Sequence, residues 1–251
     1  MTHSQCKIAL ITGASNPRDI GTAVCRKLAS QGINIFFTYW KAEPVWIEEF
    51  KQEITSMGVL CESLEIDLSN AHAAYKILDT VESKLGFPSI LVNNAAHSKS
   101  DGYLGLDALT LDEHYAVNMR STFLLCVEFA RRFEKLELDT GRIINMTSGQ
   151  DLGPMLGELA YAATKGAISA FTKSISQELA PLGITVNAVN PGPTDSTWMT
   201  DEIRQILLPK FPMGRIGLPE DVAQIIAFLA SDEARWITGQ IINSEGGFIR
   251  G

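Results

Sequence analysis

The sequence predicts an α/β fold, in which one doubly wound parallel sheet of about seven strands carries helices on both faces. Short apolar, β-branched runs alternate with longer amphipathic segments along the whole chain. The first run, Ile8–Ile11, is apolar at every position, which is typical of a parallel strand covered on both sides. No Pro/Ser-rich linker interrupts the alternation. Residues 1–251 are therefore expected to form a single domain.

The elements follow from this periodicity in chain order. Strands are expected at Ile8–Ile11, Ile33–Tyr39, Leu60–Ile66, Ile90–Asn93, Gly141–Met146, Ile184–Val189 and Gln240–Asn243. Helices are expected at Thr22–Ser30, Val45–Met57, Ala71–Leu85, Leu111–Leu136, Ala160–Leu182 and Pro219–Ala230. In an open parallel sheet, ligands bind outside the carboxyl ends of the strands, so functional residues are expected directly after each strand.

The charge balance argues against a nucleic acid as partner. The chain has 21 Lys+Arg against 29 Asp+Glu, a net charge of −8, and shows no basic stripe that would follow a phosphate backbone. It has no apolar stretch long enough for a membrane span and no apolar signal-peptide region near its start. We therefore expect a cytoplasmic protein without a membrane partner.

The cysteines and histidines do not indicate a metal site. The cysteines, Cys6, Cys25, Cys61 and Cys126, lie far apart and form no C-x-x-C motif. The histidines are also scattered, without the spacing of metal ligands. We expect no metal and no disulfide framework, and we interpret the cysteines as small buried hydrophobic residues.

A glycine-rich turn follows the first predicted strand. Gly13 can adopt a positive φ, and Gly21 allows a diphosphate to approach the start of the next helix. A plain strand-to-helix connection would also explain the turn if it stood alone. Its sequence resembles the T-G-x-x-x-G-x-G motif of short-chain dehydrogenases/reductases, with two extra residues and with Asp19 at the middle glycine. We expect Asp19 to cap the following helix, with its side chain turned away from the phosphates.

Tyr161 and Lys165 are expected on one helix face, one turn apart. A nearby ammonium stabilises a phenolate, so this pair would lower the tyrosine pKa from about 10 and make Tyr161 a better proton donor. Such a pair alone is common on exposed helices. However, Ser148 lies just after the fifth predicted strand and thirteen residues before Tyr161, and Asn118 lies in the preceding predicted helix.

These four residues together resemble the catalytic tetrad of the same family. The resemblance implies that Tyr161 donates the proton and that Ser148 polarises the substrate carbonyl. It also implies that Lys165 holds the nicotinamide ribose and lowers the Tyr161 pKa, and that Asn118 kinks its helix and supports a proton relay.

Further segments resemble the family's cofactor contacts. Asp67-Leu68 resembles the pair beside the adenine, Asn93–Ala96 the turn after the fourth strand, and Asn190–Thr194 the loop around the nicotinamide. The cofactor-binding residues implied by the resemblance are Gly13, Ser15, Arg18, Ile20, Gly21, Tyr39, Lys41, Asp67, Leu68, Asn94, Ala95, Tyr161, Lys165, Pro191, Gly192 and Thr194.

The choice of cofactor is argued from charge. An acidic residue at the end of the second strand would favour NAD, but Tyr39 stands there and Lys41 follows closely. Arg18 lies where family members commonly direct a basic residue at the 2′-phosphate. Arg18 and Lys41 therefore favour NADP, with NAD still possible. The alternative is that both are solvated surface charges.

The resemblance extends from about Lys7 to Gly247 and is closest to members similar to 3-oxoacyl-acyl-carrier-protein reductases. It implies a Rossmann fold and an NADP-preferring enzyme that interconverts a ketone or 3-oxoacyl group and a secondary alcohol by hydride transfer. The alternatives are an NAD-dependent alcohol or sugar dehydrogenase and a non-catalytic dinucleotide sensor. It also implies a homotetramer formed through Leu111–Leu136, Ala160–Leu182 and the last strand.

A substrate-covering insertion is expected near residues 194–213. Its apolar residues either form a lid or pack as a surface helix, and the sequence leaves both possibilities open. These residues are Trp198, Met199, Leu207, Leu208 and Phe211.

Overall fold

The computed structural model describes residues 7–250. Within them, seven strands form one parallel sheet in the order β3-β2-β1-β4-β5-β6-β7. The strands are β1 (Ile8–Thr12), β2 (Asn34–Tyr39), β3 (Cys61–Glu65), β4 (Ile90–Asn93), β5 (Gly141–Met146), β6 (Ile184–Asn190) and β7 (Ile241–Asn243). The predicted strands and the predicted Rossmann-like α/β class are confirmed. The winding direction reverses between β1 and β4, where such sheets open a crevice for ligands.

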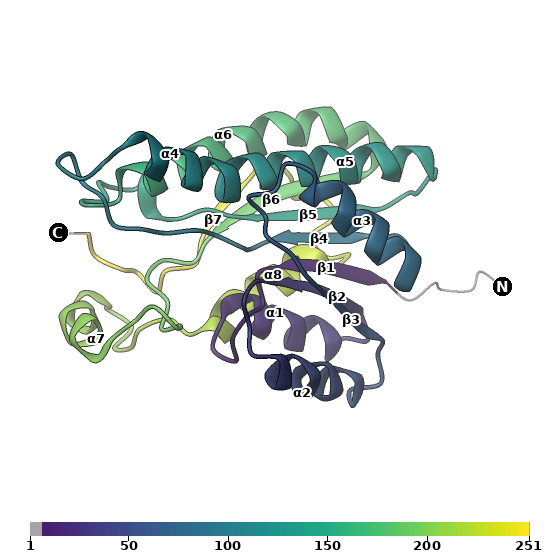
Figure 1. The fold of residues 1–251 in the computed structure, drawn as a ribbon, viewed down its shortest axis with the longest axis horizontal. Helices are drawn as coiled ribbons and strands as arrows, with labels where there is room; N and C mark the ends of the chain where they lie inside the picture. Colours follow the sequence, from purple (N-terminus) through teal and green to yellow (C-terminus); the bar gives the residue numbers. More distant parts are fainter. Residues whose placement is uncertain (1–6, 251) are drawn as a thin grey trace.

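Two helical layers cover the sheet. The helices are α1 (Ile20–Ala29), α2 (Pro44–Thr55), α3 (Ala73–Lys84), α4 (Ala108–His114), α5 (Ser121–Lys135), α6 (Leu159–Leu179), α7 (Asp201–Leu207) and α8 (Pro219–Ala230). α1, α2 and α8 lie against one face, and α3, α5 and α6 lie against the other (Figure 1).

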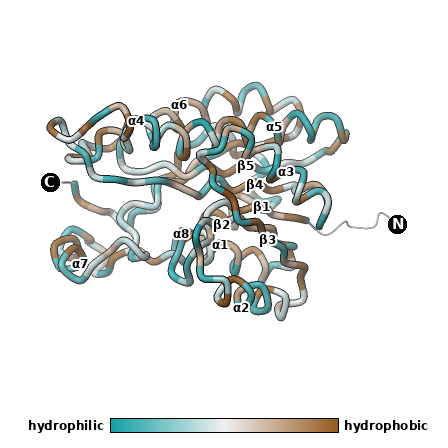
Figure 2. The backbone as a smooth tube through the Cα atoms, in the orientation of Figure 1, coloured by the Kyte–Doolittle hydropathy of each residue, from teal (hydrophilic) through white to brown (hydrophobic). Residues whose placement is uncertain are grey.

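Strand β1 shows how one sequence serves both layers. Ala9 and Ile11 belong to the apolar core under α1 and α8, whereas Ile8 and Leu10 belong to the core under α3 and α5. Successive side chains of a strand point to opposite faces, so a central strand must be apolar at every position. The turns of α5 alternate between hydrophobic and hydrophilic residues, as expected for a helix covered on one side (Figure 2).

The prediction of one continuous helix at Leu111–Leu136 is wrong, because the structure divides this region into α4, a π-helical segment and α5. The structure begins it earlier, at α4, where the Asp107 side chain accepts a hydrogen bond from Thr110 N at 2.8 Å. A π-helical segment, Tyr115–Arg120, then separates α4 from α5. A π segment places an extra residue in a turn, which interrupts the regular 3.6-residue period. The fully buried Asn118 lies within this segment.

The insertion contains α7 and its own small apolar core. Met199, Phe211 and Ile216 are buried together, and Leu207 and Phe248 pack against them. α7 stands apart from the two helical layers (Figure 1). Trp198 is half exposed instead, with 52% of its surface accessible. Part of the predicted apolar set therefore holds the insertion together, and Trp198 remains available to a ligand.

Cys25, Cys61 and Cys126 are buried and carry free thiols, as predicted. Cys6 lies outside the described residues. Among residues 7–250, no group of three or more His, Cys, Asp or Glu side chains is arranged to hold a metal ion. In the same part of the chain, no helix has the length and apolar character needed to cross a membrane.

Candidate active site

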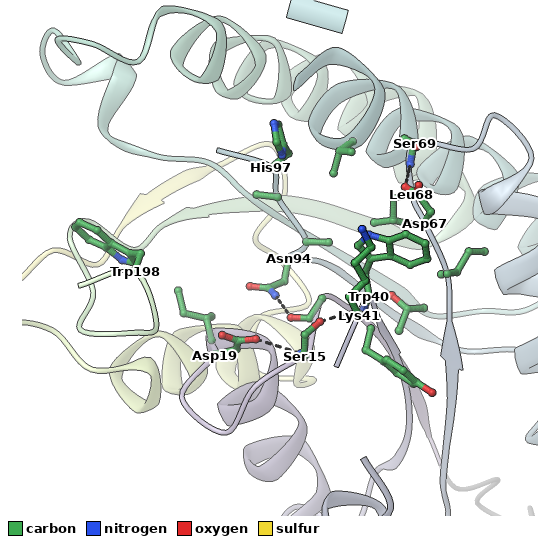
Figure 3. Close-up of a pocket in the computed structure, with 18 of the residues that line it drawn as sticks. Ser15, Asp19, Trp40, Lys41, Asp67, Leu68, Ser69, Asn94, His97 and Trp198 are labelled. Carbon is green, nitrogen blue, oxygen red and sulfur yellow. Dashed lines mark hydrogen bonds between the residues drawn. The ribbon is translucent and has the colours of Figure 1, made fainter. Parts of the chain in front are cut away.

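A cavity of about 720 Å³ opens at the carboxyl ends of β1, β2, β3 and β4, near the point where the winding reverses (Figure 3). Several predicted cofactor residues line it: Gly13, Ser15, Ile20, Tyr39, Lys41, Asp67, Leu68, Asn94 and Ala95. Other lining residues were not predicted as contacts, among them Asp19, Trp40, His97, Glu113, Ser196 and Trp198. The other predicted cofactor residues lie outside its lining: Arg18, Gly21, Tyr161, Lys165, Pro191, Gly192 and Thr194.

Close packing fixes the glycine-rich turn. Gly13 has a φ of +77°, and a Cβ there would lie 2.7 Å from the Cα of Ala95. A Cβ on Gly21 would lie 2.3 Å from the carbonyl oxygen of Gly13. Asn94 Nδ2 donates hydrogen bonds to that same oxygen at 2.8 Å and to Thr12 O at 3.0 Å. The turn is thus fastened to the end of β4, with the start of α1 beside the cavity.

The prediction that Asp19 caps α1 through its side chain is wrong. Asp19 occupies the N-cap position, but its side chain makes no cap hydrogen bond. Its Oδ2 accepts from Ser15 N at 3.1 Å, and its Oδ1 accepts from Thr197 Oγ1 at 3.0 Å. The two extra residues of the turn let the carboxylate fold back over the loop, so it lines the cavity instead of turning away from it. Burial raises the pKa of Asp19.

The far end of the cavity offers a slot for a planar base. Ile66, Leu68 and Ala95 supply apolar walls, and Asp67 lies between the first two. Asp67 Oδ1 accepts a hydrogen bond from Ser69 N at 2.8 Å, which fixes its orientation (Figure 3). Apolar walls with an adjacent acceptor suit an adenine ring.

After β2, the residues Tyr39, Trp40 and Lys41 line the cavity. Trp40 N donates to Ser15 Oγ at 3.1 Å, which joins this segment to the glycine-rich turn. Lys41 Nζ lies 5.4 Å from the centre of the Trp40 ring. Arg18 is placed differently from the prediction: its Nη2 lies 2.8 Å from Asp195 Oδ1 in the insertion. Of the two predicted cations, only Lys41 reaches the cavity wall.

Of the residues predicted to be catalytic, Tyr161 and Lys165 lie on α6, and Ser148 lies just after β5. Lys165 Nζ lies 5.4 Å from the centre of the Tyr161 ring and donates a hydrogen bond to Met146 O. Burial lowers the pKa of Lys165 to about 8. Burial and the charge of Glu158 raise the pKa of Tyr161, which reaches about 12 although a hydrogen bond with the Ser148 side chain lowers it.

The Tyr161 pKa is thus raised, whereas the sequence predicted a lowered value. Lys165 is not among the groups that shift it, so the stabilisation of the phenolate by Lys165 stays a prediction. Burial disfavours the phenolate and the ammonium alike, and in Tyr161 this effect exceeds the others. Tyr161 is consequently protonated at neutral pH, which is the form that a proton donor requires.

Asn118 holds the segment that leads from the cavity to α6. Its Oδ1 accepts from His97 N at 2.6 Å, and its Nδ2 donates to His97 O at 2.9 Å and to Thr164 Oγ1 at 3.1 Å. Because His97 lines the cavity and Thr164 precedes Lys165, Asn118 connects the two parts of the site. The proton relay implied for Asn118 stays a prediction.

Asp101 was not predicted from the sequence, although it fixes the start of α6. Its carboxylate oxygens accept from Leu159 N at 2.7 Å and from Ala160 N at 2.8 Å. Glu158, at the N-cap of α6, makes no such cap itself. An aspartate in a loop 58 residues upstream gives no local signal of this contact. Asp101 thus caps the helix that carries Tyr161 from a distant part of the chain.

The loop after β6 is braced by the end of the chain. Gly192 has a φ of +62°, and a Cβ there would lie 2.9 Å from Glu245 Cγ. The Glu245 carboxylate accepts from Asn190 Nδ2 at 2.9 Å and pairs with the Arg250 guanidinium. Thr194 is buried, and its hydroxyl donates to Gly192 O at 3.2 Å.

The cavity fits the adenosine and diphosphate half of an NAD(P) dinucleotide, and the predicted nicotinamide residues lie outside its lining. The start of α1 would hold the diphosphate, because helix N-termini attract anions. The slot beside Asp67 would hold the adenine, and the loop after β6 together with Lys165 would hold the nicotinamide half.

Known proteins resemble the chain over its whole length. Residues 13–249 match the family described as enoyl-(acyl carrier protein) reductase. The chain is 77% identical over 251 residues to Uncharacterized oxidoreductase YjdA of Bacillus subtilis (strain 168), covering 100% of both. It is 35% identical over 247 residues to the 3-oxoacyl-(acyl-carrier-protein) reductase FabG of Aquifex aeolicus (strain VF5), covering 97% of each. A solved structure, a short-chain dehydrogenase/reductase from Serratia marcescens BCRC 10948, matches with a TM-score of 0.88 at 34% identity, covering 98% of this chain and 99% of that one.

Proposed function

This chain belongs to the short-chain dehydrogenase/reductase family of oxidoreductases, and on that premise we propose that it uses NADP to interconvert a ketone and a secondary alcohol. The observation that carries the proposal is the placement of Lys165 Nζ 5.4 Å from the centre of the Tyr161 ring, with the Ser148 side chain near enough to lower the Tyr161 pKa. A phenol, an ammonium and a hydroxyl gathered beside a dinucleotide cavity can hold a carbonyl and protonate it.

Each residue has a distinct task in this proposal. Tyr161 gives its proton to the carbonyl oxygen, and the ammonium of Lys165 stabilises the phenolate that remains. Ser148 donates a hydrogen bond to the same oxygen and orients it toward Tyr161. Asn118 keeps α6 and the segment after β4 in register through its contacts with Thr164 and His97. The bound nicotinamide supplies or accepts the hydride.

The preference for NADP rests on Lys41. It is a cation at the cavity wall, and Tyr39 stands where an acidic residue would repel a 2′-phosphate. One observation favours the alternative NAD-dependent enzyme. Asp195 pairs with Arg18 and so neutralises the second cation on which the preference depended. Lys41 alone then decides between the two cofactors.

The surface near the reacting end supports an apolar substrate, such as a 3-oxoacyl thioester. Large apolar side chains are exposed on the loops that meet before α6 and on the insertion: Tyr103, Leu104, Leu156 and Trp198. The loops after β4 and before α6 touch where Asp101 N donates to Gly157 O at 2.8 Å. The acyl chain of a substrate whose carbonyl is held at Tyr161 would lie against these side chains with little desolvation cost.

Steady-state kinetics test the proposal. Purified protein is assayed with NADPH and with NADH against 3-oxoacyl thioesters, simple ketones and quinones. We expect ketone reduction, with a higher kcat/KM for NADPH, and we expect Tyr161→Phe to lose at least about a hundredfold in kcat. Equal efficiency with NADH would contradict the NADP preference. A Tyr161→Phe protein that binds dinucleotide and retains its cellular role would support the dinucleotide sensor instead.

A further inference from the structure

The side chain of Asp19 joins two segments far apart in the sequence. One carboxylate oxygen accepts from the backbone of Ser15 in the glycine-rich turn, and the other accepts from the hydroxyl of Thr197 in the insertion. Figure 3 shows Asp19 directed toward Ser15 at the edge of the cavity, with Trp198 of the insertion across from it. A carboxylate therefore lies between the turn and the insertion, where it faces the cavity.

The position that Asp19 occupies is also the one that attracts a diphosphate. Asp19 immediately precedes α1, and the first turn of a helix favours negative charge. Helix N-termini and free backbone N–H groups together form the usual anion site of this kind of fold. Since Ser15 N already donates to Asp19, the carboxylate uses a donor that a phosphate oxygen would need. Two anions cannot share this place without repulsion.

A second contact ties the same turn to the insertion. Arg18 Nη2 lies 2.8 Å from Asp195 Oδ1, and Arg204 of α7 lies 2.9 Å from the same oxygen. This ion pair is more exposed at Arg18 than at Asp195. Partly exposed pairs contribute little to stability. Of the two contacts, only the hydrogen bond between Asp19 and Thr197 involves a side chain that lines the cavity, so it is the one that a bound ligand would disturb.

We propose that Asp19 sets cofactor affinity by competing with the cofactor's diphosphate for the glycine-rich turn. For a dinucleotide to bind, the carboxylate leaves Ser15 N, and this movement also breaks its bond to Thr197. Cofactor affinity is thus coupled to the hydrogen bond between Asp19 and Thr197, which joins the turn to the insertion. The inference rests on the proposed function, because it requires a dinucleotide in this cavity.

Direct binding measurements test the inference. The dissociation constants of NADPH and NADH are measured by quenching of tryptophan fluorescence, since Trp40 and Trp198 both line the cavity. Asp19→Asn keeps the size of the side chain and removes its charge. We expect this variant to bind both dinucleotides about three- to tenfold more tightly than the wild type, the effect of removing one repelling charge at a helix N-terminus. A merely structural role for Asp19 would weaken binding instead.

Two further variants control the experiment. Asp232→Asn removes the same charge from an exposed residue that pairs with Lys7 directly before β1, at the amino ends of the strands and away from the cavity, and should leave both constants unchanged. Thr197→Val keeps the Asp19 charge but removes its tie to the insertion. It should tighten binding by a smaller factor and speed amide hydrogen exchange across residues 195–204. Circular dichroism verifies that each variant is folded.

The outcomes separate the two proposals. If neither the wild type nor the variants bind a dinucleotide, the proposed function fails. If the wild type binds and Asp19→Asn binds no more tightly, only the competition by Asp19 is wrong. If Thr197→Val leaves binding and exchange unchanged, the coupling to the insertion is wrong.

Discussion

Lys165 Nζ donates a 2.8 Å hydrogen bond to the carbonyl oxygen of Met146, two residues before Ser148. The bond fastens α6 to the end of β5, so the helix that carries Tyr161 and the strand end that carries Ser148 are held together at a buried point. Burial removes water from the Lys165 ammonium, and this desolvation lowers its pKa to about 8.

Ketone reduction should slow as the pH rises through about 8, because Lys165 loses its proton there. The protonated form, which stabilises the phenolate of Tyr161, predominates below this pKa. The rate at saturating substrates should therefore be flat below the transition and fall about tenfold per pH unit above it. Initial rates between about pH 6 and about pH 9.5 check this.

Lys165→Arg is the control for this pH dependence, because a guanidinium stays charged throughout the range. Whatever activity the variant retains should not decline above pH 8. A wild-type rate that rises steadily through this region would contradict the assignment.

Asp101→Ala should lower kcat by about ten- to a hundredfold, since a small displacement of a reacting group carries a large penalty. The variant removes the acceptor for Leu159 N and Ala160 N, directly before Tyr161. Dinucleotide affinity should change little. Kinetics and a fluorescence titration measured side by side test this.

Asp107→Ala is the matched control, because Asp107 caps α4 through Thr110 N in the same manner, and α4 carries none of the reacting residues. Both variants should melt at a lower temperature, but only Asp101→Ala should lose kcat. Equal losses would show that Asp101 acts through stability alone.

Glu158→Gln should speed the reverse reaction, alcohol oxidation. In that direction Tyr161 must accept a proton, and the charge of Glu158 raises its pKa. Removing the charge lowers the pKa and increases the phenolate fraction, so we expect oxidation at about pH 9 to be about two- to fivefold faster. Glu49→Gln makes the same charge change on the exposed side of α2 and should have no effect. Identical rates in the wild type and Glu158→Gln would contradict the influence of Glu158.

Gly13→Ala should destabilise the protein by roughly 2–4 kcal/mol and disrupt the cavity, because its Cβ would overlap Ala95 and its φ is positive. Gly32→Ala meets a similar φ of +79° with no atom within 4 Å, and should lose only about 1–2 kcal/mol. Urea unfolding compares the two. Similar losses would mean that the turn does not pack tightly against the end of β4.

Much of the fold can be predicted from local patterns in the sequence. Ile8–Ile11 predicts a central strand because each side chain of a covered parallel strand must be apolar, and the structure places these residues in both cores. The same period failed at Asn118, where a π turn interrupts the helix. At this interruption Asn118 contacts His97 and Thr164. These residues are distant in the sequence, so the helical period does not predict the contacts.

The sequence by itself determined the order of strands and helices, because these follow from periods of two to four residues. The spacing of Ser148, Tyr161 and Lys165 along the chain is likewise a property of the sequence alone. Tertiary structure alone decided that Arg18 pairs with Asp195, that Asp19 reaches Ser15 and Thr197, and that Asp101 caps α6. It also set the pKa directions of Tyr161 and Lys165. Such contacts join residues up to 178 positions apart, and burial depends on everything that surrounds a group.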